Sequence, residues 1–257
     1  MCLFFWVLNK ISVMIYNVSL SNLLVIDIET VPGTPDFQHL QESWKSLWVD
    51  NVSKTMPENF SVDEWYLQRA GIMAEFGKII CISTGFFFNE TDGKVSFKLK
   101  SLYGDDEAGL LRAFTTLLNS FKDKRGGIAI AGHNVKEFDI PYICRRMMIN
   151  QLPLPEHLQL SGKKPWETNL VDTMELWKFG DYKNYTSLKL VAAVLGIDTP
   201  KDDIDGSMVR DVYYNDHDLQ RIVTYCQKDV VTVANIIMRF KQLALLEKEN
   251  IFIANDN

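Results

Sequence analysis

Several features that would place this chain in a familiar class are missing from its sequence. Lys and Arg number 27 against 33 Asp and Glu, and the net charge of −6 excludes a basic surface that holds nucleic acid by bulk attraction. The four cysteines show no C-x-x-C spacing, so neither a zinc site nor a disulfide framework is indicated, and we expect a reduced, cytoplasmic protein. No repeat or low-complexity tract interrupts the 257 residues, and the 47% hydrophobic content is ample for a core.

A long hydrophobic run is also missing. The most apolar stretch, "MCLFFWVL", is too short to cross a bilayer, and it lacks the basic flank and cleavage pattern of a signal peptide. We therefore expect no membrane association. Residues 1–14 are interpreted as an extra strand or as a mis-assigned start, with Met14 as an alternative first residue. The whole chain, 1–257, is expected to form one domain with its core at about 22–247.

Apolar patterns predict an α/β protein with a mixed five-stranded sheet, three antiparallel strands followed by two parallel ones, flanked by helices. Asp-Gly in "ETDGK" favours a tight hairpin between the second and third strands. A helix with one apolar face then leads to a strand that we expect beside the first. The last helix is expected from about 218 to 247. The strands are expected at 23–29, 77–88, 94–103, 128–131 and 170–172.

Residues 33–77 differ from the regular elements around them. They hold Trp44, Trp48 and Trp65 among prolines and polar residues, and we interpret them as an insertion with short helices. The tryptophans are compatible with two roles, a stacking platform for bases or a lid over the core.

The first strand carries an unusual pair of acids in "VIDIET". Asp27 and Glu29 are two residues apart, so their side chains leave the same face of the strand. Two unpaired carboxylates repel each other, and a hard divalent cation such as Mg²⁺ removes that repulsion. The pair alone is equally compatible with an acidic face turned toward solvent.

A third acid follows another predicted strand in "GHNVKEFDIPY". Asp139 lies just before a helix whose first turn holds Pro141, at the carboxyl-end position where open α/β sheets bind ligands. Asp139 alone could instead cap the helix. His133 and Asn134 end the strand, and for His133 we favour hydrogen bonding to the turn.

The fourth acid lies on the last helix in "YCQKD". Tyr225 and Asp229 are four residues apart and share one side of the helix, next to its apolar stripe. A phenol and a carboxylate can therefore face the sheet. The alternative is a tyrosine at the edge of the core above an exposed acid.

Together these motifs resemble the DEDD superfamily of 3′–5′ exonucleases. "DIET" is similar to its first motif, "NVKEFDIPY" to its second and "YCQKD" to its third. The tyrosine four residues before the final aspartate resembles the tyrosine branch (DEDDy), since the histidine position of the other branch holds Thr224. The closest likeness, from about 23 to 240, is to stand-alone predicted exonucleases related to the proofreading domain of family B DNA polymerases.

The resemblance implies a ribonuclease H-like fold and two divalent metal ions, Mg²⁺ or Mn²⁺. It implies that Asp27 bridges both ions, that Glu29 and Asp229 complete one, and that Asp139 holds the other. Tyr225 would orient the attacking water. These five residues are the expected catalytic set, and the expected reaction is release of 5′-mononucleotides from a 3′ end.

Substrate contacts are expected from Thr30, Asn134, Phe138 and Lys228, although Phe138 is equally suited to the core and Lys228 to an ordinary surface position. The expected partner is the 3′ end of single-stranded DNA, with RNA ends as the alternative. A catalytically silent module that binds nucleic acid or protein is the third hypothesis. No polymerase domain is expected after the last helix, and the sequence sets no oligomeric state.

Overall fold

The computed structural model describes residue 15 and residues 18–91, 93–164, 167–181, 185–198 and 203–254. Residues 1–14, for which the sequence predicts an extra strand or a mis-assigned start, lie outside the described residues.

The described residues form one mixed sheet with the strand order β5-β4-β1-β2-β3-β6. β1, β2 and β3 are antiparallel neighbours, β4 runs parallel to β1, and β5 runs parallel to β4. This is the three-plus-two arrangement that the sequence predicts. The strands are β1 (Leu23–Pro32), β2 (Gly77–Asn89), β3 (Val95–Tyr103), β4 (Ala129–Gly132), β5 (Leu170–Asp172) and β6 (Ile251–Ile253).

The prediction of five strands was wrong by one. β6 pairs in parallel with residues 97–99 of β3 and extends the sheet at that edge. Three residues are too few to show an alternating pattern, so only the tertiary contact with β3 identifies this strand.

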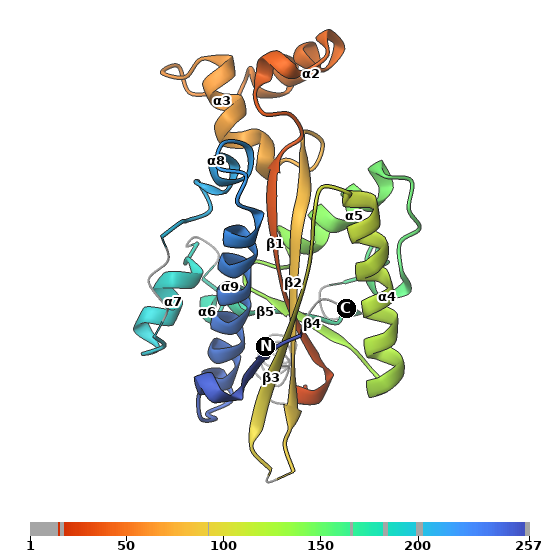
Figure 1. The fold of residues 1–257 in the computed structure, drawn as a ribbon, viewed down its shortest axis with the longest axis vertical. Helices are drawn as coiled ribbons and strands as arrows, with labels where there is room; N and C mark the ends of the chain where they lie inside the picture. The colour runs from red at the N-terminus through yellow and green to blue at the C-terminus, as the bar shows by residue number, and fades with distance from the viewer. Residues whose placement is uncertain are drawn as a thin grey trace, which may run out of the picture.

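Two helical layers enclose the sheet (Figure 1). On one face lie α4 (Glu107–Arg125) and α5 (Asp139–Ile149). Against the other face lies α9 (Leu219–Phe240), with the shorter helices beside it. Those shorter helices are α6 (Thr173–Lys178), α7 (Leu188–Val194) and α8 (Val209–Tyr214). Among the described helices, none combines the length and the apolar character that crossing a bilayer requires.

β1 lies in the interior of the sheet, between β4 and β2, and nearly all of its residues are buried. Leu24, Ile26 and Ile28 pack with the core under α4 and α5. Leu23 and Val25 point the other way and pack with the core under α9. The alternation that buries both faces also determines where each polar residue of β1 points.

The last helix ends earlier than predicted. α9 stops at Phe240, and the Leu243 amide donates to the Met238 carbonyl while Gln242 adopts a positive φ of 57°. This is a Schellman-type ending, for which glycine is the usual signal. Glutamine at that position gives no such signal, so the sequence alone extended the helix to 247.

The segment between β1 and β2 has its own small core. It contains α2 (Glu42–Val52) and α3 (Val62–Arg69), and the fully buried Trp48 meets the rings of Tyr66 and Phe76 edge to face at 5.1 and 5.0 Å. Trp48 is therefore not available to stack on a base.

Side chains from both layers fasten this segment to the sheet. From α8, Arg210 donates to the Pro35 carbonyl at 2.6 Å and Tyr214 to the Pro32 carbonyl at 2.6 Å. From α5, on the opposite face, two more side chains do the same. They are Tyr142, donating to Gly71, and Arg146, donating to Ala74, both at 2.8 Å. The segment is thus held from two sides.

Candidate active site

Asp27 and Glu29 continue the row of β1 side chains that faces α9. Asp27 lies opposite Ser83 of β2 and Glu29 opposite Cys81, and the register then shifts by one residue after Glu29. Glu29 is only 8% exposed. Both acids therefore lie on one face of the central strand, as their two-residue spacing predicts, with Glu29 buried and Asp27 half-buried.

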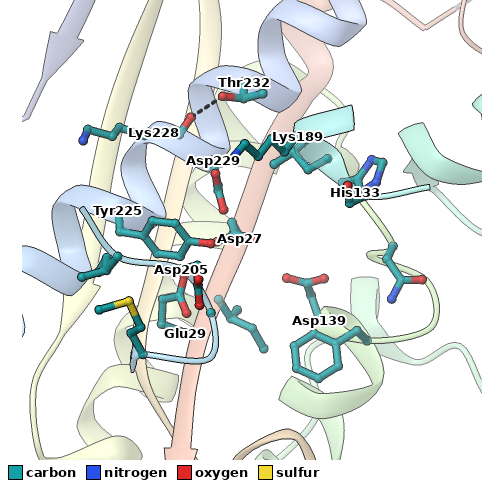
Figure 2. Close-up of a pocket in the computed structure, with 18 of the residues that line it drawn as sticks. Asp27, Glu29, His133, Asp139, Lys189, Asp205, Tyr225, Lys228, Asp229 and Thr232 are labelled. Atoms are coloured by element: carbon teal, nitrogen blue, oxygen red, sulfur yellow. Dashed lines mark hydrogen bonds between the residues drawn. The ribbon is translucent and has the colours of Figure 1, made fainter. Parts of the chain in front are cut away.

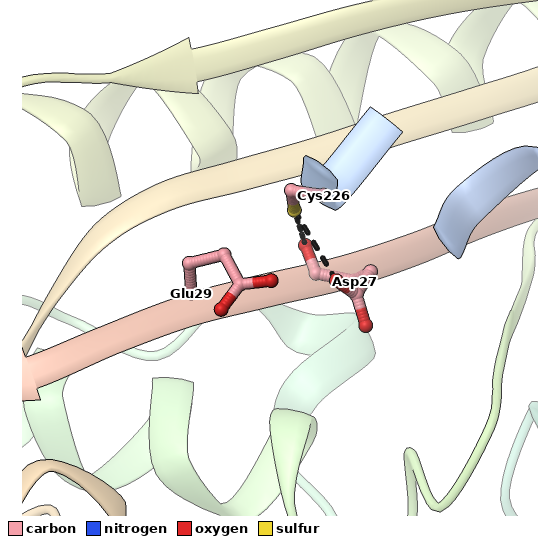
Figure 3. Close-up of side chains that lie close together, drawn as sticks. All are labelled: Asp27, Glu29 and Cys226. Atoms are coloured by element: carbon pink, nitrogen blue, oxygen red, sulfur yellow. Dashed lines mark hydrogen bonds between the residues drawn. The ribbon is translucent and has the colours of Figure 1, made fainter. Parts of the chain in front are cut away.

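The facing surface of α9 brings three polar side chains to this pair. The Cys226 thiol lies 3.2 Å from Asp27 Oδ2 and 3.4 Å from the Asp27 carbonyl (Figure 3). The Tyr225 hydroxyl is hydrogen-bonded to the Asp229 carboxylate. Figure 2 shows the side chains of Tyr225 and Asp229 extending from α9 toward Asp27. Four residues make one helical turn, so Tyr225 and Asp229 reach the same point.

Asp139 approaches from the other side of the same space (Figure 2). It is the first residue of α5 and is 4% exposed. The loop before it is held by Asp172, whose carboxylate accepts from the backbone amides of Asn134 at 2.9 Å and Lys136 at 3.1 Å. Asp172 also accepts from two amides at the start of α6 and thereby ties the two loops together.

The acids shift one another's titration. Burial raises the pKa of Asp27 well above its usual range, and the charges of Asp139 and Asp229 raise it further. Burial, followed by the charges of Asp27 and Asp229, does the same to the pKa of Glu29. Burial raises the pKa of Asp139 to about 7. A carboxylate cluster of this kind favours binding of protons or cations.

Tyr225 is shifted in the same sense. Burial, and then the neighbouring charge of Asp229, raises the pKa of its hydroxyl far above the ordinary value. The hydroxyl therefore stays protonated at neutral pH and acts as a hydrogen-bond donor.

The acids and the tyrosine line one open cavity of about 990 Å³. Its volume suits a small ligand or one end of a chain molecule. Asn134, Phe138 and Lys228 also contribute to its lining.

Comparison with known proteins gives this arrangement a context. Residues 72–250, well over half of the chain, match the family described as "Predicted 3'-5' exonuclease related to the exonuclease domain of PolB". The chain belongs to this family. Among solved structures, it is similar to the family B DNA polymerase from the hyperthermophilic archaeon Pyrobaculum calidifontis, with 16% identity and a TM-score of 0.47. That likeness covers 84% of this chain and 24% of the polymerase chain. No curated protein matches.

The exonuclease-family match includes Asp139, Tyr225 and Asp229 but begins after β1. Asp27 and Glu29 are joined to the matched part by the fold, since β1 lies between β2 and β4 in the sheet.

The predicted substrate-binding residues differ in where they lie relative to the cavity. Asn134 and Phe138 line the cavity beside Asp139, whereas the Lys228 side chain points away from the acids in Figure 2. Thr30 is not part of the cavity lining. It follows the register shift and interacts with Tyr142 of α5 instead. The expectation that His133 bonds its own turn was wrong, because its ring nitrogens contact the Thr173 hydroxyl and the Thr186 carbonyl, and His133 also lines the cavity.

Several cavity residues were missed from the sequence. Tyr185, Lys189 and Asp205 line the cavity from the segments around α7 and before α8, and Lys189 and Asp205 are labelled in Figure 2. Cys226 and Asp172 were also missed. Cys226 is inside "YCQKD", and Asp172 ends a buried strand just as Asp139 follows one, so both positions carried a signal.

The donor set fits hard divalent cations. Asp27, Glu29 and Cys226 each offer an atom within 4.8 Å of the other two, and the cavity adds the carboxylates of Asp139 and Asp229. Carboxylate oxygens are the ligands that Mg²⁺ and Mn²⁺ prefer, and cations would relieve the repulsion that raises these pKa values.

Proposed function

We propose that the protein is a metal-dependent 3′–5′ exonuclease that removes nucleotides from the 3′ end of single-stranded DNA. One observation carries this proposal. Four carboxylates from β1, α5 and α9, with a protonated tyrosine beside them, line a single cavity in a chain of the predicted-exonuclease family.

Two divalent ions fit this donor set. Asp27, at the centre of β1 between the other acids, is the proposed bridge; Glu29 and Asp229 would complete one site, and Asp139 would hold the other. When bound, such a pair stabilises the attacking and the leaving oxygen of an in-line phosphoryl displacement.

The protein's own groups orient the reactants. Tyr225 keeps its proton, which it donates to Asp229, so it cannot act as a base at neutral pH. Its hydroxyl oxygen can accept a hydrogen bond from the attacking water and so orient it. A bond forms between the water oxygen and phosphorus, and the bond to the 3′ oxygen breaks. The water gives up a proton, the leaving oxygen takes one up, and a 5′-mononucleotide departs.

Charge explains how an acidic protein accepts a polyanion. The chain carries a net charge of −6, and its cavity is lined by acids. Four carboxylates match the charge of two divalent ions, so the loaded site would be neutral when a phosphate enters. DNA is proposed over RNA because the family is related to the exonuclease domain of a DNA polymerase.

An oligonucleotide assay tests the proposal. End-labelled DNA and RNA of one sequence are incubated with the protein and Mg²⁺ or Mn²⁺, beside Asp27→Ala. Asp123→Asn, on the exposed side of α4, is the control because it removes an acid outside the cavity. We expect metal-dependent shortening of DNA by the wild type and by Asp123→Asn only. Faster shortening of RNA would reassign the substrate.

Equal shortening by Asp27→Ala would refute the assignment of the site. No shortening, together with no divalent-ion binding in calorimetry, would favour a catalytically silent binding module.

A further inference from the structure

Behind Asp27, a line of polar side chains crosses the interface between the sheet and α9. Cys226 contacts Asp27 Oδ2 at 3.2 Å and is itself hydrogen-bonded to Cys81. Cys81 Sγ lies 3.6 Å from Ser83 Oγ, and Ser83 Oγ lies 2.9 Å from Ser101 Oγ on β3. The line ends where Gln227 Nε2 donates to Ser101 Oγ at 2.9 Å.

Strand pairing and helix position account for this line. Ser83 lies between Asp27 of β1 and Ser101 of β3 in the sheet register. Cys81 is two residues from Ser83 and therefore shares its face. Cys226 and Gln227 come down from α9 at the two ends.

The line has one direction. An ionised carboxylate only accepts, so the single proton of Cys226 goes to Asp27. Each remaining thiol or hydroxyl also has one proton, so Cys81 must donate to Cys226, Ser83 to Cys81 and Ser101 to Ser83. The Gln227 amide, which only donates through nitrogen, completes the series. All five hydrogen bonds form together only when every donor points toward Asp27.

Because these groups are buried, the direction of their hydrogen bonds affects the free energy of the site. Ser83, Cys81 and Cys226 are fully buried, and Ser101 is 6% exposed. Water cannot replace these partners, and hydrogen bonds in series polarise one another by about 10–30% per bond.

We propose that this series, from Gln227 to Cys226, is a positioning device for Asp27. It holds Oδ2 from behind and leaves the other oxygen pointing away from Cys226 (Figure 3). Cys226 is thus a positioning residue, which acts through Asp27. The inference rests on the proposed function, because it concerns the carboxylate assigned to bridge the ions.

Calorimetry of Mn²⁺ binding by the full chain, under reducing conditions, tests the device. Cys226→Ala removes the donor and should raise the dissociation constant about tenfold or more, as does loss of other groups that orient metal ligands. Cys226→Ser keeps a donor and should recover most of the affinity. Ser101→Ala, far from the ligands, should weaken binding slightly, by less than about twofold, since it removes only a cooperative share.

Cys144→Ala is the matched control, because that partly buried thiol bonds the Leu158 carbonyl at 3.7 Å in the other layer. It should bind Mn²⁺ as the wild type does. Circular dichroism establishes that each variant is folded, and kcat and KM at limiting Mn²⁺ should follow the binding order.

Two results overturn the inference and leave the proposed function intact: a folded Cys226→Ala that binds Mn²⁺ like the wild type, or equal impairment of the Ala and Ser variants. If Cys226→Ala does not fold, the Mn²⁺ affinities of Ser101→Ala and Cys226→Ser test the inference instead. An unchanged affinity in Ser101→Ala then refutes the series. A wild type that binds no Mn²⁺ refutes the proposed function and the inference with it.

Discussion

Glu29 and Glu107 are buried to the same degree, each 8% exposed, but on opposite sides of the sheet. Glu107 begins α4 and accepts from Arg146 at 2.8 and 2.6 Å, from Asn150 at 2.9 Å and from the Ile79 amide at 2.8 Å. Glu29 has Asp27 and Asp229 as neighbours, and their charges raise its pKa.

The contrast separates two uses of a buried acid. The α4–α5 layer supplies its own counter-charge, so Glu107 serves the fold. On the α9 side the acids repel one another, and the fold alone gains nothing from them. Burial is the same in both places, and only the identity of the neighbours distinguishes the structural carboxylate of Glu107 from the proposed metal ligand Glu29.

The largest effect expected from this contrast is at Asp27. Asp27→Asn should lower kcat/KM about a thousandfold or more, because a metal ligand contributes several kcal/mol to the transition state. The same change should raise the melting temperature of the metal-free protein, since it removes one of the repelling charges. Steady-state kinetics and thermal unfolding in a chelator check both halves. A metal-free variant less stable than the wild type would contradict the repulsion.

Removing the counter-charge of Glu107 should lower the stability of the fold without changing metal binding, the reverse of the result expected at Asp27. Arg146→Met leaves Glu107 buried without its guanidinium and should cost about 3–5 kcal/mol of stability, while Mn²⁺ affinity of the folded fraction stays unchanged. Urea unfolding and calorimetry measure the two quantities. A variant of wild-type stability would show that Arg146 is dispensable to the fold.

Two tyrosines sharpen the comparison further. Tyr225→Phe should lower kcat about tenfold to a hundredfold with little change in Mn²⁺ affinity, because it releases the water and not the ions. Tyr142→Phe, which loses the hydroxyl's bonds to Gly71 and Thr30, is the control and should cost about 1–2 kcal/mol of stability without affecting kcat. Loss of Mn²⁺ binding in Tyr225→Phe would assign the hydroxyl a structural role.

The smallest effect expected is a dependence of stability on pH. Burial raises the pKa of Asp139 to about 7, above its value in the unfolded chain. Such a group stabilises the fold at low pH, and the contribution is lost as the pH rises through about 7. The metal-free melting temperature should therefore fall by about a few degrees between about pH 5 and pH 8. Asp139→Asn should flatten the profile, and a profile identical to the wild type's would contradict the shift.

Much of the site could be predicted because its positions follow from local periodicity. Asp27 and Glu29 share a face by strand parity, and Tyr225 and Asp229 share one by helical spacing. Pro141 in the first turn of α5 located the start of that helix beside Asp139.

What could not be predicted depends on contacts between distant segments. Thr30 reads as part of "DIET", but its side chain contacts Tyr142 of α5, on the opposite face of the sheet from the acids. The hydrogen bond between Cys226 and Cys81 joins residues 145 positions apart, and no local pattern reports it. β6 was missed for the same reason, whereas the early end of α9 was missed because Gln242 takes the place of the usual glycine in the turn.

The segment between β1 and β2 carries Ile72, which lines the cavity. The backbone of this segment is held from two sides by the side chains of Arg210, Tyr214, Tyr142 and Arg146. The part of the cavity wall that it forms therefore loses its conformational entropy when the chain folds, before any ligand binds. The proposed substrate, the 3′ end of a nucleic-acid strand, would therefore enter a cavity whose wall is already ordered. Its binding need not supply the free energy of ordering a loop.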